Sequence, residues 1–236
     1  AERKALCAEL DDVFAELQAL AHGVASLREL TPRTRDYLVV RGEQLSARLV
    51  VAGLVALGVK ARYVEAAEVI VTDGVFGNAF PDLAATDKQV RARIQPLLAR
   101  RVIPVVPGFV GGTTGGALVT LGRGGSDLTA TVLGRALKAE RITLWKDVPG
   151  LMTTDPRLVP SARIVPQLNV REAAELAYYG AKVLHPRALI PLARTAVPVF
   201  VRPFATPEAP GTEISTRHTL DKYPVKALSI VRQQAL

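Results

Sequence analysis

Short apolar runs alternate with longer segments of helical periodicity along this chain of 236 residues, and this alternation limits its fold most strongly. The helical spacing of apolar residues predicts helices over 2–21, 31–57, 86–100, 126–139, 171–179 and 186–194. The apolar runs predict strands over 59–64, 69–71, 102–106, 117–121, 141–145, 182–184 and 197–201. Strands that alternate with helices favour a layered α/β domain with a largely parallel sheet.

Local signals set several of these boundaries. Thr31 and Pro32 are typical of a helix cap and a first helical position, and Gly58 of a helix stop. For the helix over 86–100, Thr86 or Asp87 is the expected cap. A glycine-dense segment over 108–125 is expected to enclose one strand, and a strand-like run covers 225–231.

Composition excludes several classes of protein. Hydrophobic residues make up 49% of the chain and charged residues 22%, so the chain is not globally disordered. The single cysteine, Cys7, excludes an internal disulfide framework and a multi-cysteine zinc site, and it favours a cytoplasmic location. No run approaches the roughly 18 apolar residues of a membrane span, and the charged N-terminal stretch is unlike a signal peptide. No membrane partner is therefore expected.

The formal net charge of +8 is compatible with anionic partners. The densest cluster of basic residues in the sequence is interrupted by apolar residues and has no aromatic-rich strand beside it. No nucleic-acid partner is therefore expected. The cluster consists of Arg91, Arg93, Arg100 and Arg101.

The most informative segment is Thr-Leu-Gly-Arg-Gly-Gly-Ser-Asp at 120–127, where a predicted strand ends in glycines and a helix begins. Glycines let the backbone approach a ligand, and a helix N-terminus presents N–H groups to anions. Arg123 could pair with a carboxylate or phosphate, and Asp127 could orient a cation or a lysine. The alternative is a plain glycine turn with Ser126 as the helix cap. The segment matches neither a P-loop nor a Rossmann fingerprint.

Two further segments place polar residues beside predicted strands. The segment 145–150 closes a strand, where open α/β sheets bind ligands, although Asp147 could simply begin a turn. Lys182 stands in an apolar run, which favours an anionic partner; the alternative is a side chain that reaches the surface. His185 is better explained as a structural residue, and Glu43 alone is a solvated helix charge.

Together these segments resemble the catalytic domain of aspartate kinases, a branch of the amino acid kinase superfamily. The resemblance runs from about residue 30 to 215, and GRGGSD at 122–127 combined with GAKVLHP at 180–186 is its most specific part. The other matching segments are RGEQLSA at 41–47, VTDGVFGNA at 71–79, VPGFVGGTTGG at 106–116, WKDVPGLMTTDPR at 145–157 and PGTEIS at 210–215. The resemblance implies an α/β, three-layer amino acid kinase fold with a mostly parallel central sheet.

It also implies phosphoryl transfer from ATP, with Mg²⁺, to the β-carboxylate of L-aspartate, the first step of lysine, threonine and methionine biosynthesis. Glu43 would meet the amino group of aspartate and Arg123 its α-carboxylate. Phe109 and Ser126 would wall that pocket. Asp127 would organise the transfer, through the catalytic lysine or the metal.

The resemblance further assigns the nucleotide-binding positions, with Asp147 near the ribose and Arg157 and Lys182 near phosphates. These positions are Lys146, Asp147, Met152, Arg157 and Lys182. It leaves the metal ligands unassigned, and it implies a homodimer or a higher homo-oligomer.

Three departures from the family pattern modify this interpretation. The Lys-x-Gly-Gly turn that opens the family does not occur in this sequence, as if about 50–70 residues preceded it. Family members often carry threonine at Lys146 and tyrosine at Met152. The family ends in ACT regulatory domains, of which only 223–236 resembles an opening strand. The expected domains are therefore an N-terminally incomplete catalytic domain over 1–216 and a linker with a truncated ACT-like strand over 217–236.

Two alternatives stay open at this point. A fragment without the lysine-bearing strand could be catalytically inactive and only bind nucleotide or mediate subunit assembly. The same fold could also use another acceptor, such as glutamate, N-acetylglutamate or a nucleoside monophosphate.

Overall fold

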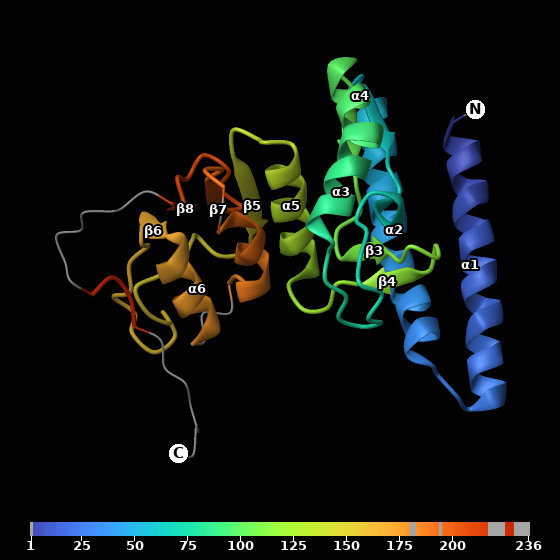
Figure 1. Ribbon diagram of the computed structural model, residues 1–236, viewed down its shortest axis with the longest axis horizontal. Coiled ribbons are helices and arrows are strands. Elements are labelled where there is room, and N and C mark those ends of the chain that lie inside the picture. Colours follow the sequence, from blue (N-terminus) through green and yellow to red (C-terminus); the bar gives the residue numbers. More distant parts are fainter. Residues whose placement is uncertain (1, 180–182, 194, 217–224, 229–236) are drawn as a thin grey trace. The chain divides into compact units, whose positions relative to one another are not determined.

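The structure is a computed structural model that describes residues 2–179, 183–193, 195–216 and 225–228. Its elements divide into two units, one ending at Ser126 and the other beginning at Asp127 (Figure 1).

Two long helices, α1 (Glu2–Leu27) and α2 (Pro32–Ala56), open the first unit and lie side by side (Figure 1). The Thr31 hydroxyl accepts a hydrogen bond from the Thr34 backbone N–H at 3.1 Å, which confirms Thr31 as the cap of α2. Arg41 of α2 pairs with Glu16 of α1 at 3.1 Å. Charged pairs between partly exposed side chains therefore join the two helices.

The strands of the first unit form two small pairs. β1 (Ala61–Tyr63) pairs in parallel with β2 (Ile103–Val105), and β3 (Val110–Gly112) pairs antiparallel with β4 (Leu118–Thr120). The segment between β1 and β2 holds η1 (Ala66–Glu68), α3 (Leu83–Gln89), the π-helical turn η2 (Val90–Ile94) and α4 (Gln95–Ala99). Val40, Ala66 and Val110 form a buried cluster that joins α2, η1 and β3.

The second unit is built on a four-stranded sheet in the order β5-β7-β8-β6. β5 (Ile142–Lys146) is parallel to β7 (Val199–Pro203), and β8 (Thr212–Ser215) is parallel to β6 (Gln167–Asn169). β7 and β8 are antiparallel, so the sheet is mixed. The helices of this part are α5 (Gly125–Ala136), α6 (Val170–Tyr178) and the 3₁₀ helix η3 (Pro186–Leu192). Leu144, Leu189, Val201 and Ile214 belong to its buried core.

Most predicted elements are present within a few residues, but the predicted cap of the helix over 86–100 is wrong. That helical region begins at Leu83, because the Asp82 carboxylate accepts hydrogen bonds from the backbone N–H groups of Ala84 and Ala85 at 2.9 and 3.0 Å. Thr86 is fully buried within it.

Several predicted strands also differ from the structure. In place of a strand over 69–71, only Val71 forms an isolated bridge, to Gly112. In the run 182–184, residue 182 lies outside the described residues, and Val183 and Leu184 lie in a turn. Residues 225–228 form no strand, although the Leu228 N–H donates to the Thr153 carbonyl at 2.8 Å. The prediction did not include β3, β6 and β8, which are three or four residues long.

Candidate active site

Two glycine-rich segments, 108–112 and 122–126, lie against each other in the first unit. The Leu121 N–H donates to the Phe109 carbonyl at 2.8 Å. A Cβ atom added to Gly108 would lie 2.9 Å from the Ser126 Cβ, and one added to Gly125 would lie 2.8 Å from the Phe109 Cδ2. Only glycines permit so close an approach. The structure therefore brings together the segments that carry Phe109 and Ser126, the two residues expected to wall one pocket.

The backbone of Phe109 has a φ of 68°, a conformation that residues other than glycine seldom adopt. Such strain is often stored at functional sites. Arg123 lies in the turn between β4 and α5 and is exposed, as is Ser126 at the start of α5. An exposed guanidinium at this turn can bind a carboxylate with two parallel hydrogen bonds.

A buried carboxylate that was not among the predicted site residues supports this turn. Asp36 of α2 is 2% exposed and accepts hydrogen bonds from the Thr120 N–H at 2.8 Å, the Thr120 hydroxyl at 3.0 Å and the Gly77 N–H at 2.7 Å. It therefore fixes α2 to the end of β4, directly before the Arg123 turn. Asp36 shares its helix face with the buried Val40, and an acidic residue on a buried helix face is the signal that could have identified it.

Glu43 stands on the same helix and is exposed. Because Asp36 joins α2 to β4, the element that carries Glu43 is fixed to the element that precedes Arg123. The two residues expected to meet the amino group and the α-carboxylate of a substrate are thus on connected elements of one unit.

In the second unit, Asp127 and Lys146 form an ion pair. The Lys146 ammonium donates to both carboxylate oxygens of Asp127, at 2.7 and 2.8 Å. Lys146 is the last residue of β5, and Asp127 lies in the first turn of α5. The side chains are 24% and 14% exposed. The pair lies at the carboxyl end of a strand, which is where open α/β sheets bind ligands.

The other predicted nucleotide-binding residues follow β5. Asp147 is exposed, and Met152 forms an isolated backbone bridge to Ile164. Arg157 is exposed and donates to both carboxylate oxygens of Asp155, at 3.0 and 2.7 Å; these hydrogen bonds raise the pKa of Arg157. Lys182 lies outside the described residues.

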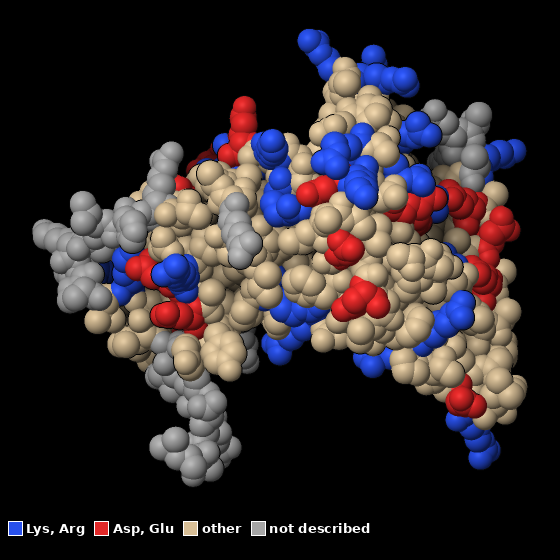
Figure 2. Space-filling view, in the orientation of Figure 1, with Lys and Arg blue, Asp and Glu red and all other residues tan. Residues whose placement is uncertain are grey.

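Among the described residues, no group of three or more histidine, cysteine, aspartate or glutamate side chains is placed to hold a metal ion. No helix in the described ranges is long and apolar enough to cross a membrane. Figure 2 shows basic and acidic side chains interspersed over the face in view, so the net charge of +8 does not gather into one basic surface there.

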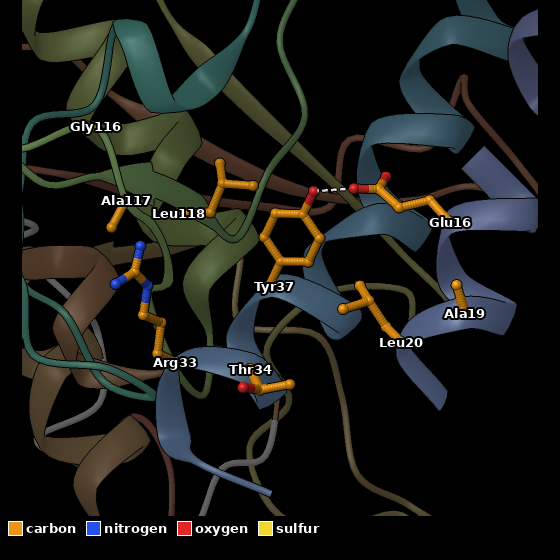
Figure 3. A pocket seen from close by; sticks show the side chains of 9 residues that line it. All are labelled: Glu16, Ala19, Leu20, Arg33, Thr34, Tyr37, Gly116, Ala117 and Leu118. Atoms are coloured by element: carbon orange, nitrogen blue, oxygen red, sulfur yellow. Dashed lines mark hydrogen bonds between the residues drawn. The ribbon is translucent and has the colours of Figure 1, made fainter. Parts of the chain in front are cut away.

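A cavity of about 630 Å³ lies within the first unit, between α1, α2 and the β3–β4 hairpin (Figure 3). The ring of Tyr37 stands in it, and its hydroxyl donates to Glu16. Burial and this hydrogen bond raise the pKa of Tyr37. None of the predicted site residues is among those that line the cavity, which are Glu16, Ala19, Leu20, Arg33, Thr34, Tyr37, Gly116, Ala117 and Leu118.

Comparison with known proteins shows the family of the chain. The model of the amino acid kinase family matches residues 3–203, which is most of the chain. The chain belongs to the amino acid kinase family. This membership and the solved structures similar to the chain confirm the expected amino acid kinase fold.

The relatives of this family member include aspartokinases. The chain is 44% identical over 220 residues to aspartokinase 1, chloroplastic, from Arabidopsis thaliana, covering 92% of the chain and 38% of that protein. It is 38% identical over 228 residues to the lysine-sensitive aspartokinase 3 of Escherichia coli K12, covering 97% of the chain and 50% of that protein. The chain thus spans half or less of the length of these relatives.

Among solved structures, E. coli aspartokinase III in complex with aspartate and ADP is similar to the chain. It has a TM-score of 0.85 and 38% sequence identity, and the match covers 90% of the chain and 47% of that structure.

Proposed function

We propose that this chain is the catalytic region of an aspartate kinase, which transfers the γ-phosphoryl group of ATP to the β-carboxylate of L-aspartate. The observation that carries the proposal is the similarity over nine-tenths of the chain to an aspartokinase structure that holds aspartate and ADP. The clustering of Phe109 with Ser126 and of Asp127 with Lys146 supports it. The product would be 4-phospho-L-aspartate, and the reaction would open lysine, threonine and methionine biosynthesis.

We assign separate roles to the site residues of the first unit and to those of the second unit. In the first unit, Glu43 would bind the amino group of aspartate and Arg123 its α-carboxylate, with Phe109 and Ser126 walling the pocket. Arg123 is suited to this role because a guanidinium matches a carboxylate in geometry and charge. The glycine contacts at Gly108 hold these walls close together.

In the second unit, the residues around the end of β5 would bind the nucleotide. Asp147 would lie near the ribose, and Arg157 and Lys182 near phosphates. Asp127 would organise the transfer. The proposed nucleotide-binding set is Lys146, Asp147, Met152, Arg157 and Lys182.

The reaction joins two anions, so positive charge and positioning supply most of the rate. A β-carboxylate oxygen forms a bond to the γ-phosphorus, and the bond from that phosphorus to the β-phosphate oxygen breaks. The electron pair of the broken bond leaves with ADP, and no proton needs to move.

Mg²⁺ is proposed to enter with ATP. In nucleotide sites Mg²⁺ keeps several waters and is held mainly by phosphates and one or two carboxylates. When bound, Mg²⁺ would neutralise phosphate charge.

A hydroxylamine trapping assay tests the proposal. With saturating ATP and aspartate, the chain should form aspartyl hydroxamate, whereas reactions without ATP or with D-aspartate should not. Absence of trapped product, together with ATP binding detected by calorimetry, would contradict the proposal and favour an inactive nucleotide-binding fragment. Equal amounts of product with glutamate or N-acetylglutamate would contradict the proposal that L-aspartate is the acceptor.

A cytoplasmic location, a homodimer or higher homo-oligomer, and the absence of nucleic-acid and membrane partners stay predictions from the sequence. Sedimentation measures the oligomeric state directly.

A further inference from the structure

The ion pair between Lys146 and Asp127 differs from the other ion pairs among the described residues. Its two side chains are 24% and 14% exposed, whereas the pairs of Arg41, Arg48, Arg93, Arg157 and Lys226 each contain a side chain that is at least 39% exposed. Removing two charges from water is costly, so a partly buried pair is weak evidence for a role in stability. A pair that gains little stability and stands at the end of a strand is better explained by a role in binding or catalysis.

The hydrogen bonds of the pair show which groups it offers to a ligand. A lysine ammonium has three N–H donors, and two of them point to the oxygens of Asp127. The third donor is left for an oxygen from outside the pair. Both Asp127 oxygens accept a hydrogen bond from the ammonium, so a metal ion at that carboxylate would have only the remaining lone pairs and would lie beside a cation. The geometry therefore favours Asp127 as the partner of a lysine over Asp127 as a metal ligand.

The backbone around the pair is fixed. Lys146 is in register with Pro203 of β7, and its carbonyl accepts the Phe204 N–H at 2.7 Å. α5 approaches the start of β5 closely, because a Cβ atom added to Gly134 would lie 2.4 Å from the Ile142 Cδ1. The two hydrogen bonds to Asp127 hold the ammonium between this strand end and the first turn of α5, and such fixed placement is the requirement for electrostatic stabilisation of a transition state.

We propose that Lys146 is a catalytic residue whose ammonium contacts the transferring phosphoryl group, and that Asp127 is the positioning residue that aims it. This proposal rests on the proposed function and changes the role of Lys146 within it, from a nucleotide contact to the cation at the transfer site. As the γ-phosphorus passes from the β-phosphate oxygen to the carboxylate oxygen, its equatorial oxygens carry the charge that the third N–H donor meets. Lys146 stays protonated throughout, and the electron pair of the broken bond leaves with ADP.

The test compares four variants in the trapping assay, with MgATP affinity measured separately by calorimetry. Lys146→Met should lower kcat by about 100-fold, the effect of removing one preorganised donor, while the Kd of MgATP changes by less than about threefold. Lys146→Arg should recover part of kcat, because the charge and the pairing with Asp127 are kept. Asp127→Asn should lower kcat, and the double variant Asp127→Asn with Lys146→Met should be no worse than Lys146→Met alone.

Lys226→Met is the matched control. Lys226 is also in the second unit, pairs with Glu172 at 2.9 Å and is 12% exposed, but it has no assigned role in the reaction. It should leave kcat unchanged even if it lowers stability. Thermal unfolding of every variant then separates a loss of the fold from a loss of the transfer step.

Three outcomes would overturn the proposal. The first is a rise in the Kd of MgATP in Lys146→Met that is as large as the fall in kcat/KM. Equal changes would mean that Lys146 only helps to bind the nucleotide. The second is additive effects in the double variant. The third is a rise in the Mg²⁺ concentration for half-maximal activity in Asp127→Asn alone, which would make Asp127 a metal ligand.

Assays of the wild-type chain with different acceptors distinguish a failure of this proposal from a failure of the proposed function. If it phosphorylates another carboxylate in place of aspartate, the proposed substrate is wrong and the Lys146 comparison proceeds with that acceptor. If it phosphorylates nothing, both proposals are wrong.

Discussion

At the scale of single residues, the Arg123→Ala substitution tests most directly how aspartate is bound. Arg123→Ala should raise the KM for aspartate by about 10- to 100-fold, because a hydrogen bond to a charged group contributes about 1.5–3 kcal/mol, and should change the KM for ATP far less. Lys182→Ala should do the reverse. Steady-state kinetics with each substrate varied in turn measures both values.

Arg100→Ala is the control for charge alone, since Arg100 is also exposed and follows α4. It should change neither KM. Equal effects of Arg123→Ala on both substrates would contradict the assigned role.

Two glycines differ sharply in what a methyl group would meet. A Cβ atom at Gly112 of β3 would lie 2.1 Å from the Ala67 carbonyl oxygen, whereas one at Gly53 in α2 would meet nothing within 4 Å. Gly112→Ala should therefore lower the free energy of unfolding by about 1–3 kcal/mol through overpacking. Gly53→Ala should raise it by about 0.5–1 kcal/mol, because alanine favours a helix. Urea denaturation measures both, and a neutral Gly112→Ala would show that β3 and η1 are not closely packed.

The sequence predicted Phe109, Ser126, Asp127 and Lys146 as site residues, but the contacts among them required the structure. Arg123, Ser126 and Asp127 belong to one motif, so their proximity follows from the chain itself. The bond from Lys146 to Asp127 depends on how α5 packs on β5, and the three bonds to Asp36 depend on the position of β4 beside α2. Such contacts join residues distant in sequence, which periodicity and motif spacing do not describe.

At the scale of elements, a tyrosine joins β1 to its neighbours and makes stability depend on pH. The Tyr63 hydroxyl donates to Glu65 at 2.8 Å, and Gln44 of α2 donates to the same carboxylate. Arg48 of α2 lies 4.1 Å above the Tyr63 ring. Burial and the hydrogen bond to Glu65 raise the pKa of Tyr63.

The raised pKa fixes the sign of the pH dependence. In the unfolded chain a tyrosine ionises near pH 10, whereas Tyr63 in the folded chain keeps its proton above that pH. At high pH the unfolded state therefore binds fewer protons than the folded state. The stability that protonated Tyr63 contributes is complete below about pH 10 and is lost as the pH rises through the folded pKa.

Tyr63→Phe should therefore show a smaller fall in the urea midpoint between pH 8 and 10.5 than the wild type. At pH 8 the variant should be less stable by about 1 kcal/mol, because the Glu65 hydrogen bond is lost. Tyr178→Phe is the control, since Tyr178 is 75% exposed and should keep the pH dependence of the wild type. An identical fall in Tyr63→Phe and wild type would contradict the role of Tyr63.

Elements with strong local signals were predicted well. α2 begins after the expected cap, and α6 follows the predicted range because its spacing is regular and Asn169 and Glu172 form a capping box. The short strands β3, β6 and β8 were missed because, unlike the equally short β1, β2 and β4, they do not lie within longer apolar runs, and β3 contains two glycines. Pairing with neighbouring strands, which is a tertiary effect, makes these segments strands.

At the scale of the whole molecule, the predicted site residues divide between the two units. Glu43, Phe109, Arg123 and Ser126, which were assigned to aspartate, belong to the first unit, and the residues assigned to the nucleotide belong to the second. A single family motif spans the division, because Ser126 ends one unit and Asp127 begins the other. The proposed function would therefore use residues of both units, and each unit has its own buried core.

This division predicts different hydrogen-exchange patterns for the two substrates. Aspartate should slow amide exchange in segments 108–112 and 122–126, and ATP should slow it in segment 145–157, because a ligand suppresses local opening of the segments that it contacts. Hydrogen exchange followed by mass spectrometry of peptides measures this. The helix α1 carries no predicted site residue and lines the cavity of Figure 3, so its exchange should not change with either ligand. Protection of α1 by aspartate or ATP would instead move the binding site to that cavity and contradict the assignment of Arg123 and Asp127.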